Sequence, residues 1–274
     1  MSARIAALFV HPVKSAAGIA CDGAVLGERG LEHDREWMIV DPDGRFLTQR
    51  DEARLALLQT AIRDGRLHLS NPEGSGPSLP LDHQGELREV IVWRAQCAAF
   101  DAGEEAAGFL SEWLGRPLRL VRFDFRRPRL SNHDWTGGRD VETTFTDGYP
   151  ILVLSQASVD DLSIRAGCVL PLQRFRANIV IDGVDAYAED AAAQLTAGGA
   201  RIVLTKPSTR CVVTTIDHTR GVRTGEEPLR ALKAYRFDRA LRGVVFGRNA
   251  FALEGAGTRL SVGMPVELLA PDNL

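Results

Sequence analysis

Short β-type runs that alternate with Asp- and Gly-containing turns constrain this chain more than any other feature. "EWMIVDPDGRFLTQR" (residues 36–50) places an Asp-Pro-Asp-Gly turn between two extended runs, and "LQTAIRDGRLHLS" (residues 58–70) repeats the arrangement with an Asp-Gly turn. Turn residues between two apolar runs are typical of β-hairpins. The sequence therefore predicts sheets that are at least partly antiparallel.

One segment of the first half, residues 101–115, is predicted to be a helix. Acidic residues lie at its start and Gly115 follows its end, which fits the helix dipole and a glycine stop. Its apolar residues recur at helical spacing: Ala106, Phe109, Leu110, Trp113 and Leu114. An irregular segment at residues 126–140 follows, and we place a domain boundary near residue 122, giving domains 1–122 and 123–274.

The second half contains more predicted strands than helices. An apolar strand ends at Ser155, where a serine-capped helix begins, and Pro228 stands in the first turn of another helix. The other segments read as strands, among them "RFRANIVIDG", "ARIVLTKP", "CVVTTID", "RGVVFGRNAFALEG" and "MPVELLA". The predicted fold class is mainly β (α+β), barrel-like and covered by a few helices.

Charge and composition exclude several classes of protein. The formal net charge of -3 gives no general attraction for nucleic acid, and no apolar run has the length of a membrane helix. The first 15 residues do not read as a leader peptide, so a cytoplasmic chain is expected. Dinucleotide, P-loop, zinc-protease and α/β-hydrolase motifs are missing from the sequence.

Two polar segments near strand ends are candidate anion-binding sites. "HPVKSAAG" puts Lys14 and Ser15 after a proline and before small residues, which leaves room for a ligand, although a solvated turn explains it as well. "GLEHDREWMIVD" puts Arg35 at the mouth of a strand beside Asp34. The Arg35 guanidinium either forms an ion pair with Asp34 or binds a phosphate or a pterin-like ring through two parallel hydrogen bonds.

A third cationic segment is "RFRANIVIDG". Alternation along a strand puts Arg174, Arg176 and Asn178 on one face, which reads either as an anion site or as an exposed sheet face.

Cys211 is the candidate for sulfur chemistry. The four cysteines are widely spaced, without a CxxC pair or histidines at zinc spacing, so a disulfide framework and a structural zinc site are not expected. Lys206 and Arg210 are near Cys211 in the sequence, and positive charge favours the thiolate that binds soft metals or attacks electrophiles. A buried, inert cysteine is the alternative.

Five segments in order resemble the MOSC family, which contains molybdenum-cofactor sulfurase C-termini and amidoxime-reducing molybdoenzymes. They are "HPVKSAAG", "GLEHDREWMIVDPDGRFLTQR", "RFRANIVIDGVDAYAED", "STRCVVTTIDHTRGVRTGEEPLRALKAYR" and "VFGRNAFALEGAGTRLSVGMPVELL". The likeness is greatest to the amidoxime-reducing branch, whose members have an N-terminal β-rich domain followed by a MOSC β-barrel. The resemblance therefore implies the same two-domain fold for nearly the whole chain.

The resemblance also implies a molybdenum cofactor (molybdopterin) and its site. Cys211 is implied as the protein ligand of molybdenum and the catalytic residue. Positions that match those holding the pterin and its phosphate are Lys14, Ser15, Arg35, Asp147, Arg176, Asn178, Thr209 and Asn249. Pyridoxal phosphate binding is a further property expected from the family.

The sequence departs from the family pattern at three places. Pro207 and Ser208 precede the ligand motif where relatives have another cysteine or a small residue, and "RAN" replaces "RPN" at Arg176. The chain stops at Leu274 without the ferredoxin-like domain of some bacterial relatives. Electrons are therefore expected from a separate ferredoxin- or flavoprotein-type donor.

Three functions remain open from the sequence. The leading one is reduction of N-hydroxylated compounds, of the hydroxylaminopurine or amidoxime type, by a molybdenum-cofactor oxidoreductase. The second is a molybdenum-cofactor or sulfur carrier that uses a Cys211 persulfide. The third is a cysteine hydrolase with His218 as base, which the seven-residue separation across a predicted strand disfavours. Nucleic-acid and membrane partners are not expected.

Overall fold

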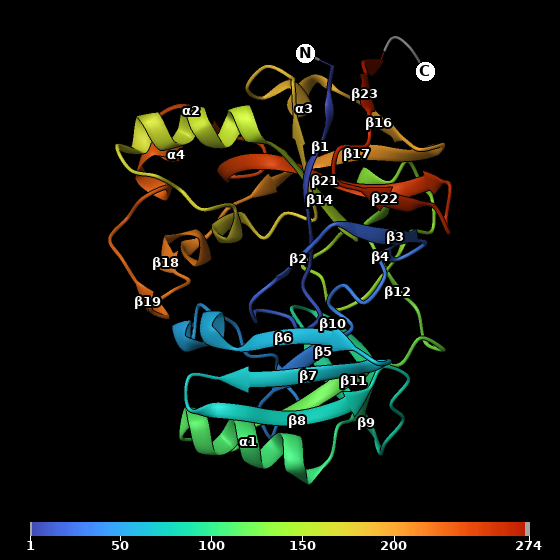
Figure 1. The fold of residues 1–274 in the computed structure, drawn as a ribbon, viewed down its shortest axis with the longest axis vertical. Coiled ribbons are helices and arrows are strands. Elements are labelled where there is room, and N and C mark those ends of the chain that lie inside the picture. Colours follow the sequence, from blue (N-terminus) through green and yellow to red (C-terminus); the bar gives the residue numbers. More distant parts are fainter. Residues whose placement is uncertain (1, 272–274) are drawn as a thin grey trace.

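The computed structural model describes residues 2–271, which form two bodies stacked along the long axis of the molecule (Figure 1). The larger body contains a nine-stranded sheet in the order β2-β1-β15-β14-β21-β17-β16-β23, with β20 beside β21. Its strands are β1 (Arg4–Val10), β2 (Ile19–Cys21), β14 (Ile151–Ser155), β15 (Ile179–Asp182), β16 (Gln194–Ala197), β17 (Ala200–Thr209), β20 (Phe237–Asp238), β21 (Gly243–Glu254) and β23 (Val266–Leu269).

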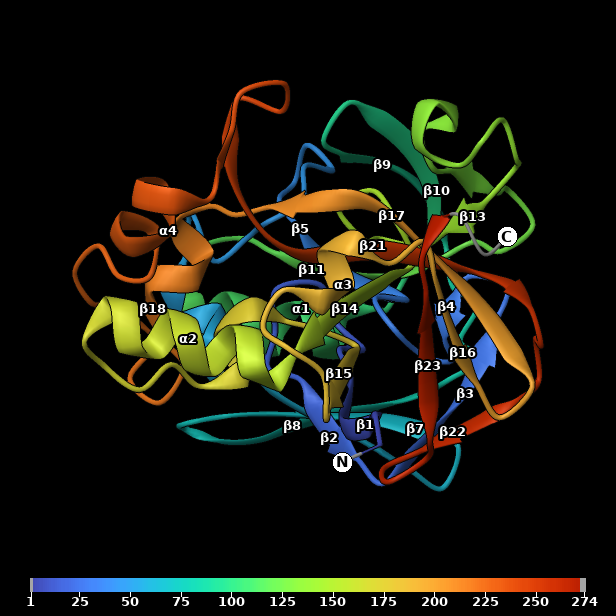
Figure 2. The same ribbon diagram turned by 90° about the horizontal axis from the view of Figure 1, so that it is seen from above.

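This sheet curls back on itself, so that β1 comes to lie beside β23 (Figure 2). The Ile5 amide donates to the Met264 carbonyl at 2.9 Å, and the Val266 amide donates to the Ala3 carbonyl at 3.0 Å. Side chains from β1, β14, β15, β16, β17 and β21 fill the space inside with Val, Ile, Leu and Ala. The predicted mainly β, barrel-like architecture is confirmed.

The smaller body combines two antiparallel sheets with one helix. Its sheets have the orders β5-β11-β10-β9 and β6-β7-β8. The elements are β5 (Trp37–Val40), β6 (Gln59–Arg63), β7 (Arg66–Asn71), β8 (Gly74–Pro80), β9 (Leu87–Val92), β10 (Ala95–Asp101), α1 (Glu104–Leu114) and β11 (Arg119–Phe123). The hairpin expected at residues 58–70 is confirmed as β6 and β7. In the hairpin expected at residues 36–50, the Leu47 amide donates to the Ile39 carbonyl across the turn.

Helix α1 forms as predicted and closes the core of the smaller body. Gly115 ends it in the left-handed conformation at φ 73°, and its amide donates back to the Ser111 carbonyl. Leu110 and Trp113 are buried in one cluster with Leu67 of β7 and Leu120 of β11.

The remaining elements connect and cover these sheets. The helices are α2 (Gln156–Ala166), α3 (Ala188–Ala191) and α4 (Leu229–Tyr235), with α2 and α4 side by side on one side of the large sheet (Figures 1 and 2). The short strands are β3 (Gly23–Gly27), β4 (Gly30–Leu31), β12 (Arg129–Leu130), β13 (Glu142–Thr143), β18 (Ile216–Asp217), β19 (Val222–Arg223) and β22 (Arg259–Ser261). In the described part of the chain, 3₁₀ turns span Ala53–Leu57, His133–Trp135, Leu172–Phe175 and Val212–Thr215.

The strand predicted from Arg174 is wrong in its first half. Leu172–Phe175 is a 3₁₀ turn, Arg176 is left-handed at φ 55°, and the strand begins only at Ile179. Alternation along a strand therefore does not place the Arg174, Arg176 and Asn178 side chains. Contacts from distant parts of the chain set the backbone there, because strand propensity is easily overridden by context.

The strand predicted from Cys211 to Asp217 is also wrong over most of its length. Val212–Thr215 forms a 3₁₀ turn instead, and only Ile216–Asp217 is extended. The Thr214 hydroxyl donates to the Cys211 carbonyl at 3.0 Å, and the Thr215 hydroxyl donates to the Val212 carbonyl at 2.7 Å. Threonine hydroxyls that bond nearby carbonyls offer the backbone an alternative to a sheet ladder.

The first strands of the chain belong to the larger body. β1 pairs antiparallel with β15, with Arg4 opposite Asp182 and Leu8 opposite Ile179. The domain division near residue 122 stays a prediction, and this pairing crosses it. No helix within residues 2–271 combines the length and the apolar character needed to span a bilayer.

Candidate functional site

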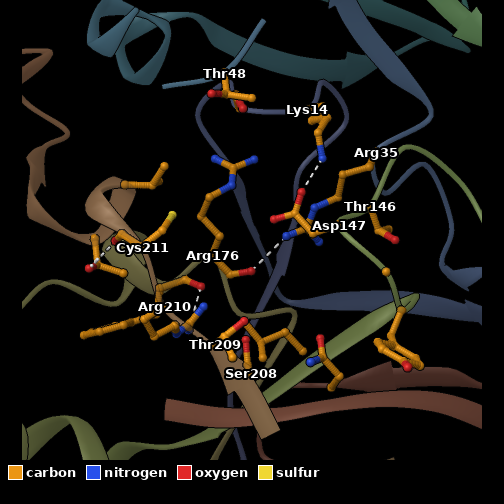
Figure 3. A pocket seen from close by; sticks show the side chains of 18 of the residues that line it. Lys14, Arg35, Thr48, Thr146, Asp147, Arg176, Ser208, Thr209, Arg210 and Cys211 are labelled. Atoms are coloured by element: carbon orange, nitrogen blue, oxygen red, sulfur yellow. Dashed lines mark hydrogen bonds and ion pairs between the residues drawn. The ribbon is translucent and has the colours of Figure 1, made fainter. Parts of the chain in front are cut away.

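A cavity of about 440 Å³ is lined by residues of both bodies (Figure 3). It brings together all nine residues singled out from the sequence: Lys14, Ser15, Arg35, Asp147, Arg176, Asn178, Thr209, Cys211 and Asn249. The lining cations are Lys14, Arg35, Arg50, Arg174, Arg176, Lys206 and Arg210, against one lining carboxylate within residues 2–271, Asp147. Such a cavity favours anionic ligands.

Arg35 and Asn178 line the cavity and are hydrogen-bonded to each other. Arg35 Nη1 donates to Asn178 Oδ1 at 3.0 Å and to the buried Asp34 carboxylate, and its Nη2 donates to the Arg176 carbonyl at 2.9 Å. Asn178 Nδ2 donates to the Phe9 carbonyl at 3.2 Å, which ties this group to β1. Asp34 therefore does pair with Arg35, yet the guanidinium still lines the cavity.

Arg176 is a half-buried cation with unused hydrogen-bonding capacity. Its Nη1 donates to the Ala16 carbonyl, whereas its buried Nη2 has no partner. Burial, together with the positive charge of Arg35, lowers the pKa of Arg176 to about 9, so the guanidinium remains charged near neutral pH. An unpaired buried donor is costly, and an anionic ligand would satisfy it.

Lys14 and Asp147 form an ion pair at the rim. Lys14 Nζ lies 2.6 Å from Asp147 Oδ1 and donates to the Phe145 carbonyl at 2.8 Å. Trp93 Nε1 also donates to Asp147 Oδ1, at 3.1 Å. Although desolvation opposes ionisation of Asp147, the Lys14 ammonium and the Trp93 donor outweigh it and hold the pKa of that carboxyl below its ordinary value. Burial lowers the pKa of the Lys14 ammonium.

Cys211 lies directly beyond the end of β17, at the opposite side of the cavity from Lys14 (Figure 3). Its sulfur is half-buried and accepts a hydrogen bond from Arg50 Nη2 at 3.2 Å. The neighbouring Arg210 turns the other way, because its Nη2 donates to the Phe175 carbonyl at 3.0 Å and its buried Nε has no partner. Burial lowers the pKa of Arg210 to about 10.

Three further predicted residues complete the lining. Ser15 is left-handed at φ 67°, Thr209 is the exposed last residue of β17, and Asn249 lies on β21. Asn249 Nδ2 donates to the Lys206 carbonyl at 3.1 Å, which joins β21 to β17 beside the cavity.

Sequence reasoning missed several lining residues, of which Arg50 and Trp93 make the most specific contacts. Trp93 lies in the loop between β9 and β10, outside the five segments that resemble the family. Arg50 is the last residue of one of those segments, but it was not among the residues implied to bind the cofactor. The other missed residues with polar side chains include Thr48, Thr146 and Ser208. Thr48, Arg50 and Trp93 enter the site because the smaller body meets the larger one there.

His218 does not pair with Cys211. Its Nδ1 lies 3.1 Å from the Ile216 carbonyl oxygen, and no hydrogen bond joins the two side chains in the described part of the chain. The proposed Cys-His hydrolase geometry is therefore absent from residues 2–271. No cluster of three or more His, Cys, Asp or Glu suited to a metal ion occurs among these residues either.

Comparisons with known proteins agree with the resemblance noted from the sequence. Residues 2–117 match the MOSC N-terminal beta barrel domain and residues 140–267 match the MOSC domain. The chain is 35% identical over 280 residues to mitochondrial amidoxime-reducing component 1 of Mus musculus, covering 97% of this chain and 82% of that protein. It is 34% identical to the same component of Homo sapiens, with the same coverage. Mitochondrial amidoxime reducing component 2 of Bos taurus is 31% identical over 85% of this chain and 72% of its own length.

Proposed function

The chain belongs to the family of MOSC-domain proteins that includes the mitochondrial amidoxime-reducing components, and from this premise we propose that it is a molybdenum-cofactor oxidoreductase for N-hydroxylated compounds. The proposed substrates are amidoximes or hydroxylaminopurines. The observation that carries the proposal is the cavity itself, where one accessible sulfur faces a group of cations collected from both bodies.

The residues present fit an anionic, sulfur-containing cofactor. Unpaired buried nitrogens on Arg176 and Arg210 are available to phosphate oxygens, and charge-assisted bonds of this kind are the stronger polar contacts. Cys211 is a soft ligand suited to molybdenum, with further ligands supplied by the dithiolene of the pterin. In this proposal the pterin and its phosphate are held by Lys14, Ser15, Arg35, Asp147, Arg176, Asn178, Thr209 and Asn249.

When bound, the cofactor supplies a metal centre that exchanges two electrons with the substrate. Reduction of an N–OH group breaks the N–O bond, consumes two electrons and two protons, and releases water. The residues of the protein hold the binding groups in position. The Arg35 bonds to Asn178 and to the Arg176 backbone fix two binding groups relative to each other, and Lys14 holds the Asp147 carboxylate at the rim.

The proposal extends to partners and location. Electrons come from a separate ferredoxin- or flavoprotein-type donor, and the substrate is a small molecule rather than a nucleic acid or a membrane. A cytoplasmic location is proposed for this chain, while the named relatives are mitochondrial. Pyridoxal phosphate binding stays a prediction, for which Lys14 and Lys206 are the lysines that line the cavity.

The decisive experiment compares Cys211→Ser with a matched cysteine variant. Protein made in a molybdenum-replete host is analysed for molybdenum by mass spectrometry and for pterin by fluorescence after oxidation. We expect stoichiometric molybdenum and amidoxime reduction in the wild type and in Cys168→Ser, because Cys168 is exposed and outside the cavity. Cys211→Ser should lose the activity and most of the molybdenum. Wild-type molybdenum content and activity in Cys211→Ser would contradict the proposal.

A sulfur carrier remains the second candidate because of one contact. The Arg50 guanidinium beside the Cys211 sulfur would stabilise an anionic persulfide as well as a metal-bound thiolate. A persulfide on the Cys211 peptide, transferred to an acceptor by protein that contains no molybdenum, favours the carrier. Stoichiometric molybdenum favours the enzyme.

A further inference from the structure

Trp93 has a backbone conformation that is ordinarily adopted by glycine. Val92 of β9 pairs with Ala95 of β10, so Trp93 and Arg94 form a two-residue hairpin loop. Trp93 is left-handed at φ 58°. The first position of such a loop favours glycine when φ is positive, since a bulky side chain is strained there. Strain of this kind persists where the surrounding structure enforces it, and it collects at functional sites.

Contacts with the cavity rim hold the Trp93 side chain in place. Its Nε1 donates to Asp147 Oδ1 at 3.1 Å, and its ring centroid lies 5.0 Å from that of Phe46. The side chain is nevertheless 42% exposed. A large aromatic surface is therefore presented to the cavity, on a hairpin of the smaller body.

The Arg50 guanidinium lies between this indole and the sulfur. Its Cζ is 4.5 Å from the centroid of the Trp93 ring, and its Nη2 is 3.2 Å from Cys211 Sγ. Arg50 forms no ion pair with a carboxylate within residues 2–271, and its side chain is exposed. A flat, delocalised N–C–N group thus lies over an aromatic ring and is directed at the Cys211 sulfur, without an ion pair to a carboxylate within residues 2–271.

We infer that the Trp93 indole is the stacking platform for the planar end of the N-hydroxylated substrate, and that Arg50 occupies this platform until the substrate displaces it. The inference rests on the proposed function. An amidoxime carries the same planar N–C–N unit as a guanidinium, and a hydroxylaminopurine carries its N–OH on a planar ring. Either one stacked on Trp93 would direct its N–OH toward the Cys211 side of the cavity.

The first test compares two substrates in Trp93→Ala and Trp93→Phe holoenzymes of equal molybdenum content. Benzamidoxime has a planar aromatic end, whereas hydroxylamine has an N–OH group and no ring to stack. The ratio of kcat/KM for benzamidoxime to that for hydroxylamine should fall about tenfold in Trp93→Ala, mainly through KM, because an aromatic stacking partner is lost. Trp93→Phe keeps an aromatic face and should retain the ratio within about twofold. An unchanged ratio in Trp93→Ala overturns the inference.

The second test measures binding of benzamidoxime by calorimetry to holoenzyme without an electron donor, so that no turnover occurs. Arg50→Ala removes the competing guanidinium, and the neutral ligand should bind severalfold more tightly. Arg50→Lys keeps the positive charge but not the planar group, and it should also bind more tightly, which separates stacking from charge. Unchanged or weaker binding in both variants overturns the inference.

The two proposals fail in different ways. If molybdenum-loaded wild-type protein reduces neither compound, the proposed function fails, and the calorimetry alone still decides whether Trp93 and Arg50 control binding. If both compounds are reduced but substitutions at Trp93 and Arg50 change neither selectivity nor affinity, the proposed function stands and the inference that Trp93 is a stacking platform fails.

Discussion

At the scale of single residues, the cavity concentrates backbone conformations that side chains rarely adopt. Within residues 2–271, eight residues other than glycine have positive φ, and four of them line the cavity: Ser15, Arg35, Trp93 and Arg176. Each such residue costs on the order of 1–3 kcal/mol, and the conformation persists only where neighbouring contacts enforce it. The Arg35 bond to the Arg176 carbonyl is one of these contacts. The site is therefore held by long-range bonds rather than by local preference.

The pH dependence of stability can be predicted at His218. Burial, with a smaller contribution from Arg176, lowers the pKa of His218 to about 4, below its ordinary value of about 6.5. As the pH falls from about 6.5 to about 4, His218 takes up a proton in the unfolded chain before it does so in the folded protein. The folded protein therefore loses stability over this pH range. Between about pH 7 and about pH 4.5 the wild type should lose about 2 kcal/mol more than His218→Gln.

Urea unfolding of the two proteins at both pH values measures this difference. Acidic groups that titrate in the same range contribute equally to both proteins, so they cancel in the comparison. Parallel losses in wild type and His218→Gln would show that the imidazole is not neutral and buried as described.

At the scale of elements, the join between β14 and α2 depends on one serine. Ser155 ends the strand and caps the helix: it is fully buried, and its hydroxyl accepts from the Ser158 amide at 3.1 Å. The Ser155 amide donates to the buried Glu189 carboxylate at 3.2 Å. The predicted strand and serine-capped helix are therefore confirmed. The strand is β14, which pairs with β15 and contributes to the lining of the cavity.

Ser155→Ala should lower the free energy of unfolding by about 1–2 kcal/mol, because the first turn of α2 loses its cap. Ser75 is exposed on β8, and Ser75→Ala, the matched control, should change it by less than about 0.5 kcal/mol. Urea denaturation midpoints compare the three proteins. Equal midpoints for wild type and Ser155→Ala would mean that the cap contributes nothing.

At the scale of the whole molecule, the site is built from residues of both bodies. β1 supplies Ile5, Leu8 and Val10 to the core of the larger body, while Arg50 and Trp93 of the smaller body reach the sulfur and the rim. Neither body contains a complete site by itself.

A fragment of residues 123–274 should therefore fail to form a stable, cofactor-loaded protein. It lacks β1, which leaves the edge of β15 unpaired and removes buried apolar side chains from the core. Circular dichroism, thermal unfolding and molybdenum content provide the measurements, with the full chain as the control. Cooperative unfolding of the fragment at the temperature of the full chain would contradict this expectation.

The sequence by itself determined the local features: the hairpin at residues 58–70, helix α1 and its glycine stop, and the strand and cap at Ser155. Turn chemistry and periodicity act over a few residues, so they can be read without a structure. Through its ordered resemblance to a family, the sequence also identified nine residues that the fold collects in one cavity.

Only the tertiary structure decided the rest. Two runs that read as strands became 3₁₀ turns at Leu172–Phe175 and Val212–Thr215, and β1 joined the larger body. Trp93 entered the site although it belongs to none of the five segments, and Arg50 entered it although the segment that it ends was not expected to contribute this residue. The reason is that contacts between residues far apart in the chain leave no periodic trace in the sequence. They also outweigh local preference wherever a buried cation or a strained loop is held from several sides.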